Sequence, residues 1–291
     1  MGCQDIFCKI FFLFVVETPI GWTDSEKNDT LLLSPNEWTR TCLPNIIDSV
    51  RCESKKLMKT DELLSATVEE YLETIYNMSM ENEIVIGARL AERFHVAPPT
   101  VTEMLKRLVR DGYIEMNNKR QVTLTELGNQ VAEAVLRRHR LTERFLVDML
   151  GMQWHEVHEE ACRLEHFISG AVEARVIANL NNPLTCPHGN PIPGSVPNAR
   201  TYLQDKHAVR LSTVPEGKKA TIICVSEVVE DEEALILYLH EKGLMPDTGL
   251  TVLVPAGRNH PEVGDSVKLR VGEREVLISN AAATKLWVSI S

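Results

Sequence analysis

The feature that most constrains this fold is a pair of short helical patterns. A proline pair separates them, and a strand–turn–strand pattern follows them. The first helix is predicted over residues 86–96 and ends at Pro98-Pro99. The second can begin there, over 100–110, because proline is favourable at the first helical position. Residues 113–124 then predict two strands joined by a tight turn that contains an Asn-Asn pair. The order indicates a winged helix-turn-helix, with an ordinary helical hairpin as the alternative.

The second helix and the wing carry the candidate DNA contacts. The chain has a formal net charge of −10, which argues against indiscriminate nucleic-acid binding but permits a local basic surface. Basic side chains here are placed to contact phosphates, and side chains near the helix start are placed to meet base edges. The candidate DNA-binding residues are Pro99, Thr100, Thr102, Glu103, Lys106, Arg107, Lys119 and Arg120.

Helical periodicity continues on both sides of the winged pattern. An amphipathic helix is predicted from Thr67, and three more follow the wing, over 126–150, 154–169 and 171–180. After a Pro/Gly/Asn-rich stretch, short β runs surround one helix, and this arrangement predicts a small SH3-like β-barrel. The predicted strands are 220–225, 250–255, 266–271 and 274–278, and the helix is 232–242. The fold class is therefore mainly α with a small β domain.

Residues 1–57 differ from the rest of the chain. The apolar run 6–16 is too short to span a bilayer, and it lacks the flanking residues of a secretory leader. We expect a poorly ordered extension, or a mis-assigned start with Met58 as the true one, with a membrane anchor as the alternative. Deleting it should leave DNA binding intact. The seven scattered cysteines contain no Cys-x-x-Cys pair, which argues against a disulfide framework and fits a cytoplasmic protein.

Residues 155–166 combine three histidines, four glutamates and a cysteine in a segment of helical character. His158, Cys162, Glu165 and His166 lie at offsets of 0, 4, 7 and 8, so they share one helical face. Imidazole, thiolate and carboxylate are ligands of divalent transition metals. A solvated acidic helix is the alternative. The histidine spacing excludes a His-Glu-x-x-His zinc-protease motif, and the cysteine spacing disfavours a zinc finger.

Other ligand-type residues lie outside that segment. His139 and Glu143 are four residues apart on a predicted helix, so they share one face. Cys186 and His188 lie in a Pro-rich turn and could bind a metal, although a structural role is favoured there. Three acids near the start of the first helix suit the helix dipole, which is their simpler interpretation. These acids are Glu69, Glu70 and Glu73.

With these residues, the chain from about 64 to 194 resembles the diphtheria-toxin-repressor (DtxR/MntR/IdeR) family of metal-dependent transcriptional repressors. Residues 208–291 resemble the FeoA/SH3-like domain of its longer members. The stretches that carry the resemblance are 68–76, 90–93, 138–145, 157–166 and 189–194. The expected domains are a winged helix (58–128), a helical metal-binding and dimerisation domain (129–195), a linker (196–213) and the FeoA/SH3-like domain (214–291). The resemblance implies a repressor of metal-uptake genes that binds a double-stranded DNA operator.

The resemblance also implies two metal sites per subunit, for Mn²⁺ or Fe²⁺ as corepressor. The ancillary site takes His139, Glu143, His158, Glu227 and Glu230, the last two placed by register in the FeoA/SH3-like domain. The primary site takes Glu70, Cys162, Glu165 and His166, with Glu73 beside them. Iron-type members have methionine at the position of Glu70, whereas manganese-type members have acids at Glu70 and Glu73. Hard oxygen suits Mn²⁺ and the thiolate suits Fe²⁺, so the metal stays open, with manganese favoured.

A homodimer is expected, because one winged helix reads too few base pairs for useful specificity. The candidate interface is formed by Ala161, Leu164, Phe167 and Ile168 with the helix over 171–180. Two other functions compete with this one: a metal-independent winged-helix regulator, and a metal protein that does not bind DNA. No nucleophile–base pair or open zinc motif supports catalysis, so we expect no enzyme and no membrane partner.

Overall fold

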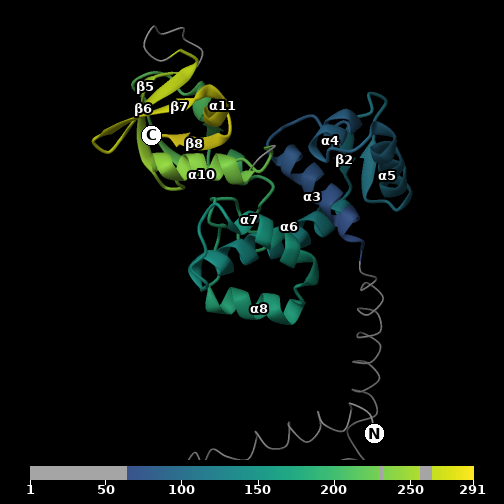
Figure 1. Ribbon diagram of the computed structural model, residues 1–291. Coiled ribbons are helices and arrows are strands. Elements are labelled where there is room, and N and C mark those ends of the chain that lie inside the picture. The colour runs from purple at the N-terminus through teal and green to yellow at the C-terminus, as the bar shows by residue number, and fades with distance from the viewer. Residues whose placement is uncertain (1–63, 230–231, 256–263) are drawn as a thin grey trace, which may run out of the picture. The chain divides into compact units, whose positions relative to one another are not determined.

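The computed structural model describes residues 64–229, 232–255 and 264–291 (Figure 1). The predicted extension over 1–57 therefore lies outside the described residues. Across the described ranges, no helix combines the length and apolar character needed to cross a membrane.

The winged helix-turn-helix predicted from the sequence is confirmed. Its elements are α3 (Ala66–Met80), α4 (Gly87–Arg93), α5 (Pro98–Arg110), β1 (Ile114–Met116) and β2 (Val122–Leu124). Helix α5 begins with the proline pair and buries Val101, Leu105 and Leu108, which recur at helical spacing on one face. The two strands pair antiparallel, with Ile114 opposite Leu124. At the wing tip the Asn117 side-chain oxygen accepts hydrogen bonds from two backbone N–H groups and closes the turn.

A helical layer follows the wing. It consists of α6 (Glu126–Asp148), α7 (Val157–Leu164), the 3-10 helix η1 (Glu165–Phe167) and α8 (Gly170–Asn179). Thr125 caps α6, because its side chain accepts a hydrogen bond from the N–H of Gly128. Helix α6 packs against α3, α7 and α8, so it joins the winged helix to the helices that carry the predicted ligand face. The helix predicted over 154–169 is shorter at both ends and tightens to 3-10 geometry at Glu165.

The C-terminal domain is a six-stranded antiparallel sheet in the order β3-β8-β4-β5-β6-β7. Its elements are β3 (Ala208–Arg210), β4 (Lys219–Val225), α10 (Glu232–Lys242), β5 (Gly249–Val254), β6 (Ser266–Val271), β7 (Arg274–Ser279) and β8 (Leu286–Ile290). The short helices α9 (Tyr202–Asp205), η2 (Leu211–Thr213) and α11 (Asn280–Ala283) complete it. The four predicted strands are present. Strands β3 and β8 were not predicted, and β3 lies in the stretch expected to be a linker.

Candidate metal centre and DNA-reading face

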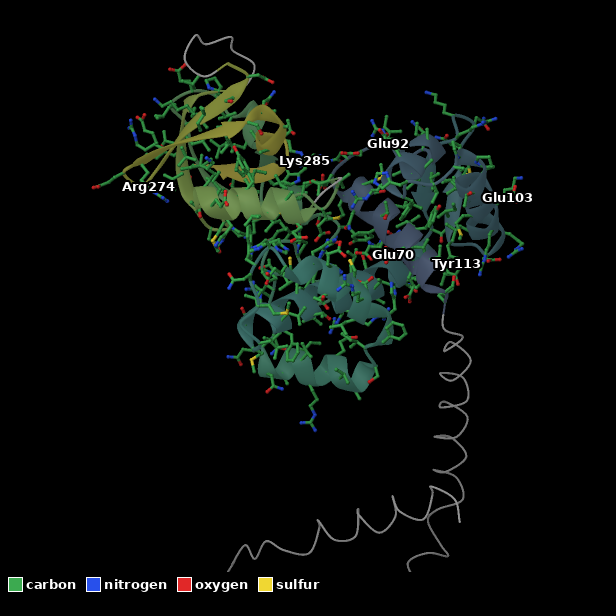
Figure 2. All side chains as sticks on the ribbon, in the orientation of Figure 1. Glu70, Glu92, Glu103, Tyr113, Arg274 and Lys285 are labelled. Atoms are coloured by element: carbon green, nitrogen blue, oxygen red, sulfur yellow. The ribbon has the colours of Figure 1, made fainter. Side chains whose placement is uncertain are left out.

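Helices α3, α6 and α7, the 3-10 helix η1 and one loop bring ligand-type side chains together. Helix α3 supplies Glu70 (labelled in Figure 2) and Glu73, and α6 supplies His139 and Glu143. The residues of the predicted ligand face come from α7, which supplies His158 and Cys162, and from η1, which supplies Glu165 and His166. The Pro-rich loop after α8 supplies Cys186 and His188. Together these residues form four groups of three, each with its ligand atoms within 4.8 Å of one another.

Glu165 belongs to two of these groups. One contains Glu70, Glu165 and His166, and the other contains Glu73, His139 and Glu165. The carboxylate of Glu165 lies 2.6 Å from Nδ1 of His139, and Nε2 of His166 lies 3.2 Å from Glu70. Glu165 is fully buried. Because one carboxylate serves both groups, they form one continuous set of donors between α3, α6 and η1.

The other two groups extend this set along α6. Cys162 lies with His139 and His158, its Sγ 3.7 Å from Nε2 of His158. The predicted primary site placed Cys162 with Glu165 and His166, so the structure groups it differently. Glu143 lies with Cys186 and His188, 3.2 Å from Nδ1 of His188. All three of these residues are buried.

The buried donors fit a divalent cation. Oxygen Oε2 of Glu143 is buried and has no hydrogen-bond partner among the described residues. An unpartnered buried carboxylate oxygen is costly, and a cation would remove that cost. Burial raises the pKa of Glu73 well above its usual value, and the nearby Glu165 carboxylate raises it further. A cation bound between Glu73 and Glu165 would attract both carboxylates and so offset their mutual repulsion.

Neighbouring ligand-type groups shift the pKa values of His139 and Cys162. Burial alone would lower the pKa of His139, but Glu143 and hydrogen bonds with its neighbours hold it well above its usual value. Burial would raise the pKa of the Cys162 thiol, yet hydrogen bonds with His139 and His158 lower it. The thiolate is the form of cysteine that binds metals. The lowered pKa of Cys162 favours the form that binds a metal ion, whereas a metal on His139 would have to displace the proton that its raised pKa favours.

Glu69 contacts His166 and Arg138, two contacts that the sequence did not reveal. Its Oε2 lies 2.6 Å from Nδ1 of His166, which leaves Nε2 of that ring facing Glu70. Its Oε1 accepts a hydrogen bond from Arg138, whose Nε donates to the backbone oxygen of Glu165 at 2.8 Å. A carboxylate on the far nitrogen of a histidine ligand fixes the ring orientation. From sequence alone, Glu69 was indistinguishable from an acid that suits a helix start.

The structure does not bring Glu227 into any of the four groups. Its carboxylate pairs with Arg140 on α6, at 2.6 Å from Nη2 and 3.0 Å from Nε. Burial would raise the pKa of Glu227, but the Arg140 guanidinium lowers it. Arg140 is almost fully buried, and a buried guanidinium needs a counter-charge of this kind. Glu230, the other predicted ligand of this domain, lies outside the described residues.

The predicted DNA-binding side chains lie on the exposed face of α5 and on the wing. Thr102, Lys106, Lys119 and Arg120 line one cavity of about 570 Å³ between these two elements. Arg107 lies apart from it and pairs with Asp111 at 3.6 Å. The other three predicted residues are exposed on α5, with Glu103 2.8 Å from Lys106. These remaining residues are Pro99, Thr100 and Glu103.

Three families match consecutive parts of the chain. Residues 63–122 match the N-terminal DNA binding domain of iron dependent repressors. Residues 125–194 match their metal binding and dimerisation domain, and residues 209–290 match the FeoA domain. The order of the three matches is the order expected from the sequence.

Individual relatives agree with these matches. The iron-dependent repressor IdeR of Mycobacterium tuberculosis is 41% identical over 196 residues, which cover 66% of this chain and 85% of that protein. The diphtheria toxin repressor of Corynebacterium glutamicum is 35% identical over 195 residues, which cover 66% and 86%. A solved manganese-dependent transcriptional repressor in complex with manganese has a TM-score of 0.63 and 32% identity, covering 76% of this chain and 99% of that one. This chain belongs to the iron-dependent repressor, or diphtheria-toxin-repressor, family of metal-dependent, DNA-binding transcriptional regulators.

Proposed function

We propose that this regulator represses metal-uptake genes and that its corepressor is a divalent transition metal ion, Mn²⁺ or Fe²⁺. The observation that carries the proposal is the meeting of α3 acids with ligands of α6 and η1 around Glu165. Helix α3 is the first helix of the winged-helix domain, so a metal-dependent contact on α3 acts directly on the DNA-reading part. The proposal gives the cluster no catalytic role.

Two metal positions are proposed within the cluster. The first is the carboxylate-rich set centred on Glu165, with Glu70, Glu73, His139 and His166. The second is centred on Glu143, Cys186 and His188, with His158 and Cys162 on the side toward the first. Hard oxygen in the first set suits Mn²⁺, whereas the thiols of the second suit softer ions such as Fe²⁺. A bound divalent ion supplies positive charge and coordination bonds to these acids.

The ligands on α3 couple the metal to DNA. Without a cation, Glu70 and Glu73 repel Glu165, so α3 is held less firmly against α6 and η1. Neutralising that repulsion fixes α3, and with it the orientation of α5 and the wing. Coupling between two binding sites is reciprocal, so operator DNA should also tighten metal binding.

A homodimer through the η1–α8 face is part of the proposal. Phe167 is 85% exposed and Val172 on α8 is 51% exposed, and α8 has no buried residue in this single chain. An exposed apolar face of this kind marks an interaction site. Ala161 is fully buried within the subunit, so its predicted place at the interface is not available to a partner.

Phe167→Asp is expected to convert the dimer into monomers at micromolar concentration, because a charge in a buried apolar contact is strongly unfavourable. Light scattering would give the mass of each form. Leu277→Asp is the matched control, since Leu277 is also an exposed apolar residue but lies on β7. A parent protein that is monomeric, or a Phe167→Asp protein that stays dimeric, would exclude this face.

Selection from a pool of random duplex DNA tests the function without a known operator. With Mn²⁺ or Fe²⁺ the protein should enrich a sequence with two related half-sites, and with chelator it should enrich none. Equal enrichment with chelator would identify a metal-independent regulator. A protein that binds metal but enriches nothing would be a metal protein without this DNA-binding function.

A further inference from the structure

We propose that the segment Ser226–Val229, here called the docking segment, holds the winged-helix domain to the C-terminal domain without metal and thereby sets how much metal activates DNA binding. The segment directly follows β4 of the C-terminal sheet. The inferred effect of the segment on DNA binding rests on the proposed function. Its inferred role in holding the winged-helix domain does not.

Val228 is part of the winged-helix core. Its side chain is 9% exposed and packs in the hydrophobic cluster of α3, α4, α5 and the wing. Every other buried member of that cluster lies between residues 68 and 136. One valine of the C-terminal domain therefore completes the core of a different domain. Burying such a side chain contributes to the stability of both partners.

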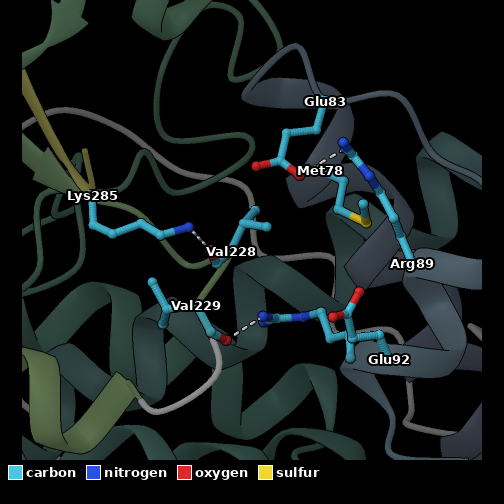
Figure 3. Close-up of a pocket in the computed structure, with 8 residues that line it drawn as sticks. Met78, Glu83, Arg89, Glu92, Val228, Val229 and Lys285 are labelled. Atoms are coloured by element: carbon cyan, nitrogen blue, oxygen red, sulfur yellow. Dashed lines mark hydrogen bonds and ion pairs between the residues drawn. The ribbon is translucent and has the colours of Figure 1, made fainter. Parts of the chain in front are cut away.

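Three consecutive backbone carbonyls of the docking segment accept hydrogen bonds from cationic side chains. Arg93, the last residue of α4, donates to the oxygens of Glu227, at 2.6 Å, and Val229. Lys285 donates to the oxygen of Val228 at 2.6 Å (Figure 3). Buried carbonyls of irregular backbone need such donors. Because Arg93 belongs to the helix-turn-helix, it ties this motif to the segment directly.

The side chains of the segment hold the C-terminal end of α3. Ser226 donates a hydrogen bond at 2.7 Å to Glu81, the residue directly after α3, and Arg210 of β3 pairs with the same carboxylate. Glu227 pairs with Arg140, which in turn donates to Asn77 on the last turns of α3. These contacts join the docking segment to α3 and α6, and none of them requires a metal ion.

The docking segment and the metal cluster thus hold the same helix at two places. The proposed ligands Glu70 and Glu73 lie on the first turns of α3, and Asn77 begins the part held by the docking segment one turn later. A helix already fixed at one end loses less conformational freedom when its other end is fixed. Weakening the segment should therefore raise the metal concentration that DNA binding needs, without changing the number of metal ions bound.

Arg93→Ala in the full chain tests this inference, with Arg89→Ala as the matched control. Both arginines lie on α4 and line the same cavity of about 380 Å³, but Arg89 is exposed and pairs with Glu83 at 3.4 Å (Figure 3). Amide hydrogen exchange in metal-free protein should become about tenfold faster in α3 and α4 for Arg93→Ala and stay near the parent rate for Arg89→Ala. Unchanged exchange in Arg93→Ala, or equal acceleration in both variants, would overturn the proposal.

Two further variants separate docking from metal ligation. Glu227→Gln should keep the metal stoichiometry of the parent and raise the half-activating metal concentration several-fold, whereas loss of one bound ion would make Glu227 a ligand and refute its docking role. Val228→Thr should accelerate exchange as Arg93→Ala does, with Val229→Thr as its control. If the parent bound no DNA with metal, the proposed function would fail, but the exchange measurements would still decide the docking role.

Discussion

Glu165→Gln is expected to abolish the metal-dependent gain in DNA affinity and to leave the folded dimer intact. Glutamine keeps the shape of the side chain but removes the charge that two of the four ligand groups share. Both of those groups contain an acid of α3, so this one change uncouples α3 from the metal. Couplings of this kind are worth about 1–3 kcal/mol, or roughly 5–150-fold in affinity. DNA titrations by fluorescence anisotropy, with metal and with chelator, measure the gain.

Glu160→Gln is the control for this experiment. Glu160 lies on α7 near Glu165, but it is only partly buried and pairs with Arg163, so the same chemical change there should leave the whole gain in place. Circular dichroism and light scattering establish that each variant is folded and dimeric. If Glu165→Gln keeps most of the gain, or Glu160→Gln loses as much, the cluster around Glu165 is not the activating site.

The local part of this cluster was predictable because helical periodicity places residues three and four apart on one face. His139 and Glu143 on α6 follow from that rule. The rule also brings His158 and Cys162 together on α7, whereas Glu165 and His166 lie on η1 and belong to other ligand groups. The same rule predicted α5, whose buried residues recur at that spacing. These predictions depend only on neighbours within two turns of a helix.

Contacts between distant segments were not predictable from local pattern. Cys186 and His188 meet Glu143 only because the Pro-rich loop folds back onto α6, and composition favoured a structural role for that loop. Glu69 reaches His166 across 97 positions of the chain. Arg140 is a charged residue on a long helix, and nothing in its neighbours indicates that it is buried and paired with Glu227.

The prediction of short strands failed for a related reason. Strand β3 has three residues and pairs with β8 at the other end of the domain. Three residues are too few to display a period of two, so β3 was assigned to a linker. Its strand character comes from pairing with β8, which follows α11 and was not predicted either. The size of the sheet therefore depends on pairing that only the folded chain reveals.

Replacing Lys106, Lys119 and Arg120 together by glutamine is expected to cause a large loss of DNA affinity, similar for all DNA sequences. These side chains line the cavity between α5 and the wing, and all three are exposed. A basic side chain that neutralises a phosphate releases counterions, and each such contact contributes about −0.9 to the slope of log affinity against log salt. Loss of three contacts should make that slope less negative by about 2.7. Anisotropy titrations at several salt concentrations, with metal present, give the slope directly.

Lys206, Lys218 and Lys219 provide a matched control, since they are also exposed but belong to the C-terminal half. Changing them to glutamine alters the net charge of the chain equally. General electrostatic attraction would respond alike to both triple variants, whereas phosphate contacts on α5 and the wing respond only to the first. Equal slopes for the two variants would therefore remove this face from the DNA-binding mechanism. A changed slope in the first variant alone would assign the counterion release to the winged helix, and an unaltered metal stoichiometry in that variant would separate DNA contact from metal sensing.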